Sequence, residues 1–287
     1  MNYIKSILQI CFQNFRKWKT DYRIWLIAII VLLMTHSYIQ DVSKIADLLE
    51  TSQTAWNFPF LYAQFYMKLL FTLPLLFLFC DAPFMDANQL FVIVRAGRTK
   101  WCIGQMLYIL LASAVYYLYV MALTILLPLQ RIEWSTDWGA LLNTIARTDI
   151  AADQGARFLF VSSDVLTYFT PIQAMWFTFL VSWLGGAFLG MIVYCCNVWL
   201  KSSMAGSIVG AVMILLSAFL ANDYWTGTKW FSPFSWNTLN MIDIAGLTRN
   251  PPFWYVMTFY IGGSLLLFDC ILILNRTMRM EQNGGNR

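Results

Sequence analysis

Charged residues are scarce in this sequence. Asp, Glu, Lys and Arg make up 12% of the 287 residues, while 59% are hydrophobic. Globular domains average roughly 25% charged residues, so these charges are too few to cover the surface of a soluble domain. The composition predicts a membrane protein without a soluble catalytic domain. The net charge of +4 gives no reason to expect nucleic acid as a partner.

The residues and motifs of common catalytic sites are also missing. His36 is the single histidine, and the sequence contains no GxxxxGK[ST] phosphate loop, no GxSxG elbow and no HExxH zinc motif. The adjacent Cys195 and Cys196 have no histidine near them in sequence, which favours packing over metal binding. We therefore expect no catalytic residue, no metal and no bound cofactor. Any energy source must come from another chain or from an ion gradient.

Six apolar stretches are long enough to cross a bilayer, whose hydrocarbon core requires roughly 20 residues in a helix. They cover residues 24–40, 58–80, 102–127, 170–195, 204–221 and 252–274. Long unbroken runs argue against a β-barrel. The predicted fold class is an all-α integral membrane protein that forms one domain over residues 1–287.

The distribution of charge predicts the orientation. With the amino terminus inside, the inner segments hold 12 basic and 4 acidic residues, and the outer loops hold 6 basic and 10 acidic residues. This positive-inside bias predicts that both termini are cytoplasmic. We expect the protein to lie in the plasma membrane. No outer loop contains a cysteine, as expected of a chain that forms no disulfides in an oxidising compartment.

Two segments on the inner side are expected to do more than connect spans. Residues 3–22 place apolar and basic side chains on opposite faces of a helix, which predicts an interfacial amphipathic helix; a generic basic leader is the alternative. Residues 81–101 predict a short amphipathic helix over 84–94, a basic turn over 95–100, and an interfacial anchor at Trp101. This second segment is interpreted either as a docking element for a cytosolic partner or as a product of the positive-inside rule alone.

Two outer segments differ in character. Residues 128–168 predict either a small folded cap or helices on the outer leaflet, and Pro128 is a plausible end for the third span. Residues 222–251 are rich in aromatic residues, with Trp225, Trp230 and Trp236 suited to an interfacial belt. Pro233 interrupts this segment, which predicts a re-entrant element if protein covers its backbone.

Small and charged residues inside the predicted spans suggest contacts between helices. Small residues recur at four-residue spacing in the fourth and fifth spans, which predicts close helix packing within the chain or at a dimer interface. They are Ser182, Gly186, Gly190, Gly206 and Gly210. Lys68 is predicted mid-span and Asp269 in the inner half of the last span, about 10 Å apart in depth. Structural pairing or a polar cavity wall is preferred to a proton relay for these two charges.

This arrangement resembles the permease subunits of type-2 ABC exporters. The shared features are the helix at 3–22, six spans, the pattern RAGRTKWCIGQ at 95–105 in the position of a coupling helix, and the broken segment FSPFSW at 231–236. The resemblance implies a homodimer or heterodimer in the lipid bilayer, with each permease docked on a separate ATPase subunit that binds ATP and Mg. The implied docking residues are Phe84, Asp86, Arg95, Gly97, Arg98, Lys100 and Trp101. The cargo is left open among peptides, drugs and lipid-like molecules.

Three other functions stay open from the sequence. A secondary transporter would use Lys68 and Asp269 for coupling, although no inverted repeat is evident. An immunity or sensor protein would bind a peptide through the 128–168 loop without transport. An intramembrane enzyme is the least favoured alternative, given a single histidine.

Overall fold

The computed structural model describes residues 3–85, 89–156, 158–221, 227–243, 246 and 248–284, with backbone only for 90 and 276–284. It is all-helical: 75% of the chain is helix, and the described residues contain no strand. The α-helices are α1 (Tyr3–Lys17), α2 (Tyr22–Leu48), α3 (Phe65–Phe79), α4 (Gln89–Ala96), α5 (Arg98–Leu126), α6 (Gly139–Arg147), α7 (Ile150–Asp153), α8 (Ser163–Tyr168), α9 (Pro171–Trp199), α10 (Ala205–Leu220) and α11 (Phe253–Gly284). Short 3₁₀ helices are η1 (Phe58–Phe60), η2 (Leu129–Arg131), η3 (Thr228–Phe231), η4 (Pro233–Ser235) and η5 (Leu239–Met241).

Four helices in the described part of the chain are long and apolar enough to cross a membrane. They are α2, α5, α9 and, in α11, the stretch Phe253–Asn275. Many of their large apolar side chains are exposed, such as Trp25 and Leu266. The predictions of an all-helical chain with membrane-spanning helices are therefore confirmed at this level.

Two of the six predicted spans form shorter helices. Helix α3 has 15 residues and α10 has 16, so at 1.5 Å per residue they extend about 22–24 Å, less than a hydrocarbon core of about 30 Å. The predicted helical start of the second span at residue 58 is wrong. Residues 58–60 form η1, and Phe58, Leu61 and Tyr62 are fully buried. Segment η1 packs against α5 and α9, which are distant in sequence. These contacts bury the three side chains, so the backbone conformation here is set by packing and not by continuation of α3.

The amino-terminal helix is also shorter than predicted. It ends at Lys17, and α2 begins at Tyr22 with Asp21 as its N-cap. The Asp21 carboxylate accepts a hydrogen bond from the Arg23 backbone N–H at 3.0 Å, which satisfies one of the unpaired donors at the helix start. Trp18 therefore lies in the turn between the two helices.

Helix α9 occupies the centre of the bundle. In its most apolar stretch of 18 residues, 72% of the residues are buried. A Cβ atom at Gly190 would lie 2.5 Å from Ile109 of α5 and 2.9 Å from Phe79 of α3, and one at Gly210 of α10 would lie 2.6 Å from Leu76 of α3. Gly186 and Gly206 face similarly close contacts, and Ser182 is fully buried. The small residues thus permit close helix packing within the chain, which was one of the two predicted uses.

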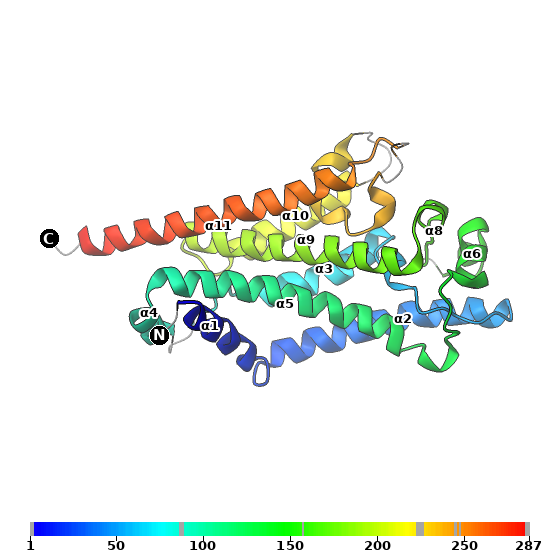
Figure 1. The fold of residues 1–287 in the computed structure, drawn as a ribbon, viewed down its shortest axis with the longest axis horizontal. Helices are drawn as coiled ribbons and strands as arrows, with labels where there is room; N and C mark the ends of the chain where they lie inside the picture. The colour runs from blue at the N-terminus through cyan, green and yellow to red at the C-terminus, as the bar shows by residue number, and fades with distance from the viewer. Residues whose placement is uncertain are drawn as a thin grey trace.

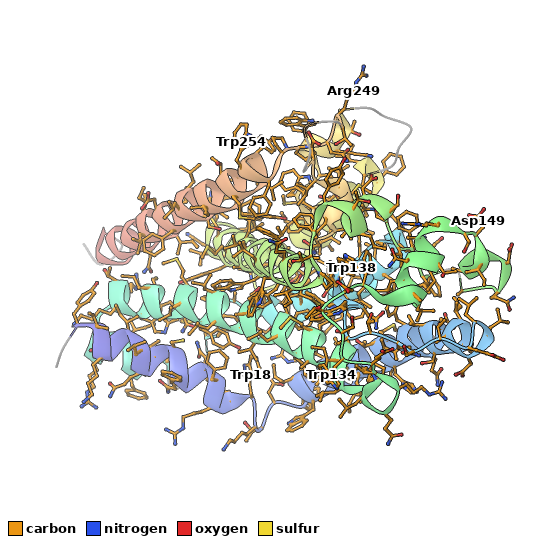
Figure 2. The ribbon with its side chains drawn as sticks, turned by 45° about the vertical axis from the view of Figure 1, so that its right-hand side comes forward. Trp18, Trp134, Trp138, Asp149, Arg249 and Trp254 are labelled. Carbon is orange, nitrogen blue, oxygen red and sulfur yellow. The ribbon has the colours of Figure 1, made fainter. Side chains whose placement is uncertain are left out.

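Figure 1 shows an elongated bundle with different structures at its two ends. The α4 end carries α1, α4 and both termini, and the α6 end carries α6 and α8 (Figure 1). At the α6 end, Trp138 is buried, donates a hydrogen bond to the Phe169 carbonyl at 3.0 Å and packs on Phe60. Figure 2 shows Trp138 within this region and Trp254 of α11 pointing away from the bundle. Helices α6 and α8 thus pack on this end of the bundle through buried side chains such as Leu142 and Val165.

The segment after α10 is irregular and largely buried. Its described part contains η3, η4 and η5, and Trp236 is fully buried. The Tyr260 hydroxyl of α11 donates to the Pro233 carbonyl at 2.5 Å, and the Ser232 hydroxyl donates to the Ser217 carbonyl of α10 at 2.5 Å. Protein thus covers this backbone, which was the condition set for a re-entrant element. Trp225 lies outside the described residues.

Candidate functional site

Helix α4 presents an exposed apolar face at the α4 end of the bundle. Val94 is 87% exposed and Phe91 is 77% exposed, and they lie three residues apart on one face of the helix. Arg95 beside them is also exposed. This exposed face of α4, formed by Phe91, Val94 and Arg95, is the candidate docking surface.

A single residue separates α4 from α5. Gly97 has a φ of +87°, a conformation that costs glycine little and other residues more. The predicted basic turn over 95–100 is therefore wrong, because α5 begins at Arg98. Lys100, in the first turn of α5, lies over the ring of Tyr3 with its ammonium nitrogen 5.2 Å from the ring centre. This cation–π contact connects α5 with α1.

Trp101 connects α4 with α5. Its indole N–H donates to the Gln89 side-chain oxygen at 2.6 Å, and Trp101 is only 4% exposed. It was predicted as an interfacial anchor and as a docking residue. Its burial suits a positioning role, in which it fixes α4 against α5.

Helix α1 packs directly against α5. A Cβ atom at Gly104 would lie 2.7 Å from the Ile10 side chain, so only glycine permits this approach. Asn14 of α1 donates to the side-chain oxygen of Gln105 at 2.5 Å, and both residues are buried. Buried polar groups stabilise a contact when they are paired, so this bond helps to fix α1 along α5.

The linker between α3 and α4 makes both ionic and aromatic contacts. Arg23 of α2 forms an ion pair with Asp81 and lies 3.5 Å from an Asp21 oxygen. Phe84 packs edge-to-face on Tyr108 of α5, with ring centres 4.9 Å apart. The predicted docking residue Phe84 thus packs the linker against α5. The predicted docking residue Asp86 lies outside the described residues.

Asn197, near the end of α9, joins three segments. Its amide nitrogen donates to the Ala82 carbonyl at 2.7 Å and to the Cys80 carbonyl at 3.2 Å. Its side-chain oxygen accepts a hydrogen bond from the Gly206 backbone N–H of α10 at 2.7 Å. Asn197 is 4% exposed, so it ties the linker before α4 to α9 and α10 through buried hydrogen bonds.

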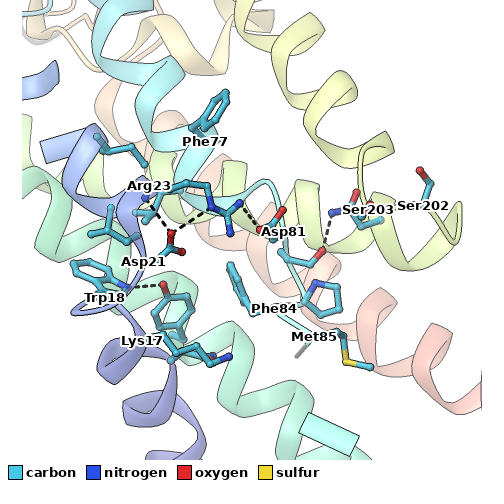
Figure 3. A pocket seen from close by; sticks show the side chains of 18 of the residues that line it. Lys17, Trp18, Asp21, Arg23, Phe77, Asp81, Phe84, Met85, Ser202 and Ser203 are labelled. Carbon is cyan, nitrogen blue, oxygen red and sulfur yellow. Dashed lines mark hydrogen bonds and ion pairs between the residues drawn. The ribbon is translucent and has the colours of Figure 1, made fainter. Parts of the chain in front are cut away.

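These contacts surround a cavity of about 370 Å³ at the α4 end. Figure 3 shows Arg23 linked to both Asp21 and Asp81 on one side, with Lys17 at the end of α1 and Trp18 in the following turn nearby, and Ser202 and Ser203 on the opposite side. A cavity with several charged side chains differs from the apolar packing of the rest of the bundle. Figure 3 therefore identifies a second candidate site, adjacent to the α4 surface.

Burial raises the pKa of the Cys11 thiol to about 11 and, with a smaller contribution from Asp81, raises the pKa of Cys80 to about 11. The thiolate is the reactive form, so at pH 7.5 only a very small fraction of either thiol is ionised. We expect both cysteines to react slowly with iodoacetamide in the folded protein and faster as the pH rises toward 11. Peptide mass spectrometry would measure this. Rapid labelling at pH 7.5 without denaturant would contradict the burial.

The structure does not bring Lys68 and Asp269 together. Because α3 begins at Phe65, Lys68 lies in its first turn rather than mid-span; it is buried and lines a cavity with Gln64 and Phe219. Asp269 is exposed on α11, 16 residues beyond its start, or about 24 Å along the helix. The two charges thus lie at different positions along different helices, Lys68 near the start of α3 and Asp269 well inside α11.

Sequence reasoning missed Asn197, Tyr108 and Gly104. A single asparagine, tyrosine or glycine in a span matches no motif, and only the segments that it contacts reveal its role. Within the described residues, no group of three or more His, Cys, Asp or Glu side chains is arranged to hold a metal ion. No protein-family model matches the sequence, and comparisons with curated proteins and with solved structures give no match.

Proposed function

We propose that the chain is the permease subunit of an ATP-binding-cassette exporter and that a separate ATPase subunit docks on the exposed face of α4. The observation that carries this proposal is the combination of exposed apolar and basic side chains on a short helix that is fixed at both ends. Val94 and Phe91 face outward, while Trp101 and Asn197 connect the flanking segments to the bundle.

In the proposed arrangement, six segments cross the plasma membrane and both termini are cytoplasmic. Helix α3 completes its crossing together with η1, which precedes it. Helix α10 completes its crossing together with η3 and η4, which follow it and form the re-entrant element. Two permease subunits, identical or different, form the transport path in the bilayer. ATP and Mg bind to the partner ATPase, and this chain has no catalytic residues of its own.

The proposed motion follows the contacts at the α4 end. When the ATPase subunits close on ATP, they move α4, and Trp101 passes the movement to α5. Phe84 and Asn197 pass it to α5, α9 and α10. The helices change their relative positions and open the path to a peptide, drug or lipid-like substrate. In the alternative of a secondary transporter, coupling would have to use a buried Lys68 and an exposed Asp269 on different helices.

The test is co-purification with the soluble phosphate-loop protein of a neighbouring reading frame. We expect that Arg95→Glu combined with Arg98→Glu removes binding of this ATPase and leaves membrane insertion unchanged, because charge reversal at an interface introduces repulsion. Arg95→Glu alone should weaken binding at least severalfold, since Arg95 is exposed and its replacement leaves the fold intact.

The matched control is Lys44→Glu, which reverses an exposed charge on α2 with a side chain that is 73% exposed. This variant should bind the ATPase as the unaltered protein does. Normal co-purification of the double variant would overturn the assignment of α4 as the docking surface. Transport that continues without any ATPase would overturn the exporter proposal itself.

A further inference from the structure

We propose that the cavity at the α4 end and an apolar groove beside it form one binding site for an anionic phospholipid. The phosphate group would lie in the charged cavity and one acyl chain in the groove. This inference goes beyond the proposed exporter function, because it concerns a lipid bound to this chain alone.

The cavity has a positive charge balance. Lys17, Arg23 and Lys201 line it together with two acidic residues, Asp21 and Asp81. Both acidic side chains contact Arg23. Three basic and two acidic side chains give the described lining one net positive charge. Ser202 and Ser203 add hydroxyl groups on the side that Lys201 occupies. A phosphate carries negative charge and several acceptor oxygens, which such a lining can bind.

The groove has the opposite character. It encloses about 290 Å³ and is lined mostly by apolar and aromatic side chains, among them Trp25, Ala28, Val115, Tyr116 and Tyr119, together with Lys19. Its two tyrosine hydroxyls are already bound, since Tyr116 donates to the Phe71 carbonyl at 2.6 Å and Tyr119 donates to the Ala28 carbonyl at 3.0 Å. The groove therefore offers mainly apolar surface, which suits a hydrocarbon chain.

The cavity and the groove are adjacent. Trp18, Ile24, Ile27 and Leu78 line both. The Trp18 indole N–H donates a hydrogen bond to the Tyr108 hydroxyl at 2.8 Å. This bond fixes the Trp18 side chain at the boundary between the polar cavity and the apolar groove.

The order of the two parts along the helices matches the order in a lipid. Tyr108 of α5 lines the cavity, while Val115 and Tyr119 of the groove follow 7 and 11 residues later. At 1.5 Å per residue they lie about 10 and 16 Å farther along the apolar helix. A bound phospholipid would thus place its head group at the end of the bundle and its chain beside α2 and α5, as in the surrounding bilayer.

The experiment is native mass spectrometry of the delipidated full chain, titrated separately with phosphatidylglycerol, phosphatidylcholine and glycerol phosphate. We expect one phosphatidylglycerol to bind about tenfold or more tightly than phosphatidylcholine, because only the former has net negative charge. Glycerol phosphate should bind much more weakly than phosphatidylglycerol, because it lacks the acyl chains. Equal binding of the two lipids, or equal binding of glycerol phosphate and phosphatidylglycerol, would overturn the proposal.

Matched variants separate the two parts of the site. Lys17→Gln combined with Lys201→Gln should reduce phosphatidylglycerol binding about tenfold, whereas Lys44→Gln should not. Val115→Trp should fill the groove and weaken both lipids about tenfold, whereas Val212→Trp, on an exposed position of α10, should not. Thermal midpoints confirm that each variant is folded. Unchanged lipid binding in the folded lysine variant or in folded Val115→Trp would overturn the site.

Discussion

Replacing Gly206 with alanine is expected to destabilise the folded chain by about 3 kcal/mol, near the upper end of the usual cost of overpacking. A Cβ atom at this position would overlap the Val193 carbonyl oxygen of α9 and lie 2.7 Å from the Asn197 side-chain oxygen. The first neighbour is backbone in the middle of a helix, so it cannot rotate away. Helix α10 would have to move away from α9, which would also weaken the bond between Asn197 and the Gly206 N–H.

The measurement is thermal unfolding in detergent, followed by size-exclusion chromatography. For a chain of 287 residues, 3 kcal/mol corresponds to a fall in the midpoint of about 5 °C. Gly262→Ala is the matched control, because a Cβ atom at Gly262 has no neighbour within 4 Å. In a helix this change should be neutral or stabilising by up to about 1 kcal/mol. Equal midpoints for the two variants would contradict the close contact between α9 and α10.

Replacing Asn197 with leucine is expected to cost about 2–4 kcal/mol and to loosen the linker before α4. The change leaves the Ala82 and Cys80 carbonyls and the Gly206 N–H without this side chain as a partner, and a buried polar group without its partner costs about 1–3 kcal/mol. Asn143→Leu is the control, since Asn143 is half-buried in α6 and its amide donates to the Gly139 carbonyl of its own helix at 2.8 Å.

Two measurements report this change. The thermal midpoint should fall in Asn197→Leu and stay nearly constant in Asn143→Leu. In a background where Cys80 is the remaining cysteine, labelling of Cys80 at pH 7.5 should become faster, because its carbonyl is no longer held by Asn197. Slow labelling together with an unchanged midpoint would show that Asn197 does not hold the linker.

Hydrophobic runs predicted much of the fold correctly. The length of these runs identified α2, α5, α9 and α11. A helix that crosses a bilayer needs a long run of apolar residues, and such a run can be read from the local sequence alone. The ends of elements were less predictable. The second span begins seven residues later than expected, and the basic turn after α4 reduces to Gly97. In both places, contacts with residues far away in sequence decide where the helix ends.

The candidate site was predicted only in outline. The importance of 81–101 could be proposed from its position and its basic residues, and the structure gives it an exposed helix. The individual roles could not be predicted, since Trp101 is buried against Gln89 and Phe84 packs on Tyr108. Such roles depend on which side chain from another helix lies opposite, and a single sequence contains no record of those pairs.

The sequence by itself determined that this protein is helical and apolar, because composition and the length of apolar runs are properties of the chain alone. Only the tertiary structure decided that Lys68 is buried while Asp269 is exposed, that Gly206 contacts α9, and that Asn197 joins three segments. It also decided that a charged cavity borders an apolar groove. These features arise where helices distant in sequence meet, and side-chain shape and hydrogen-bond geometry select among the packings that hydrophobicity allows.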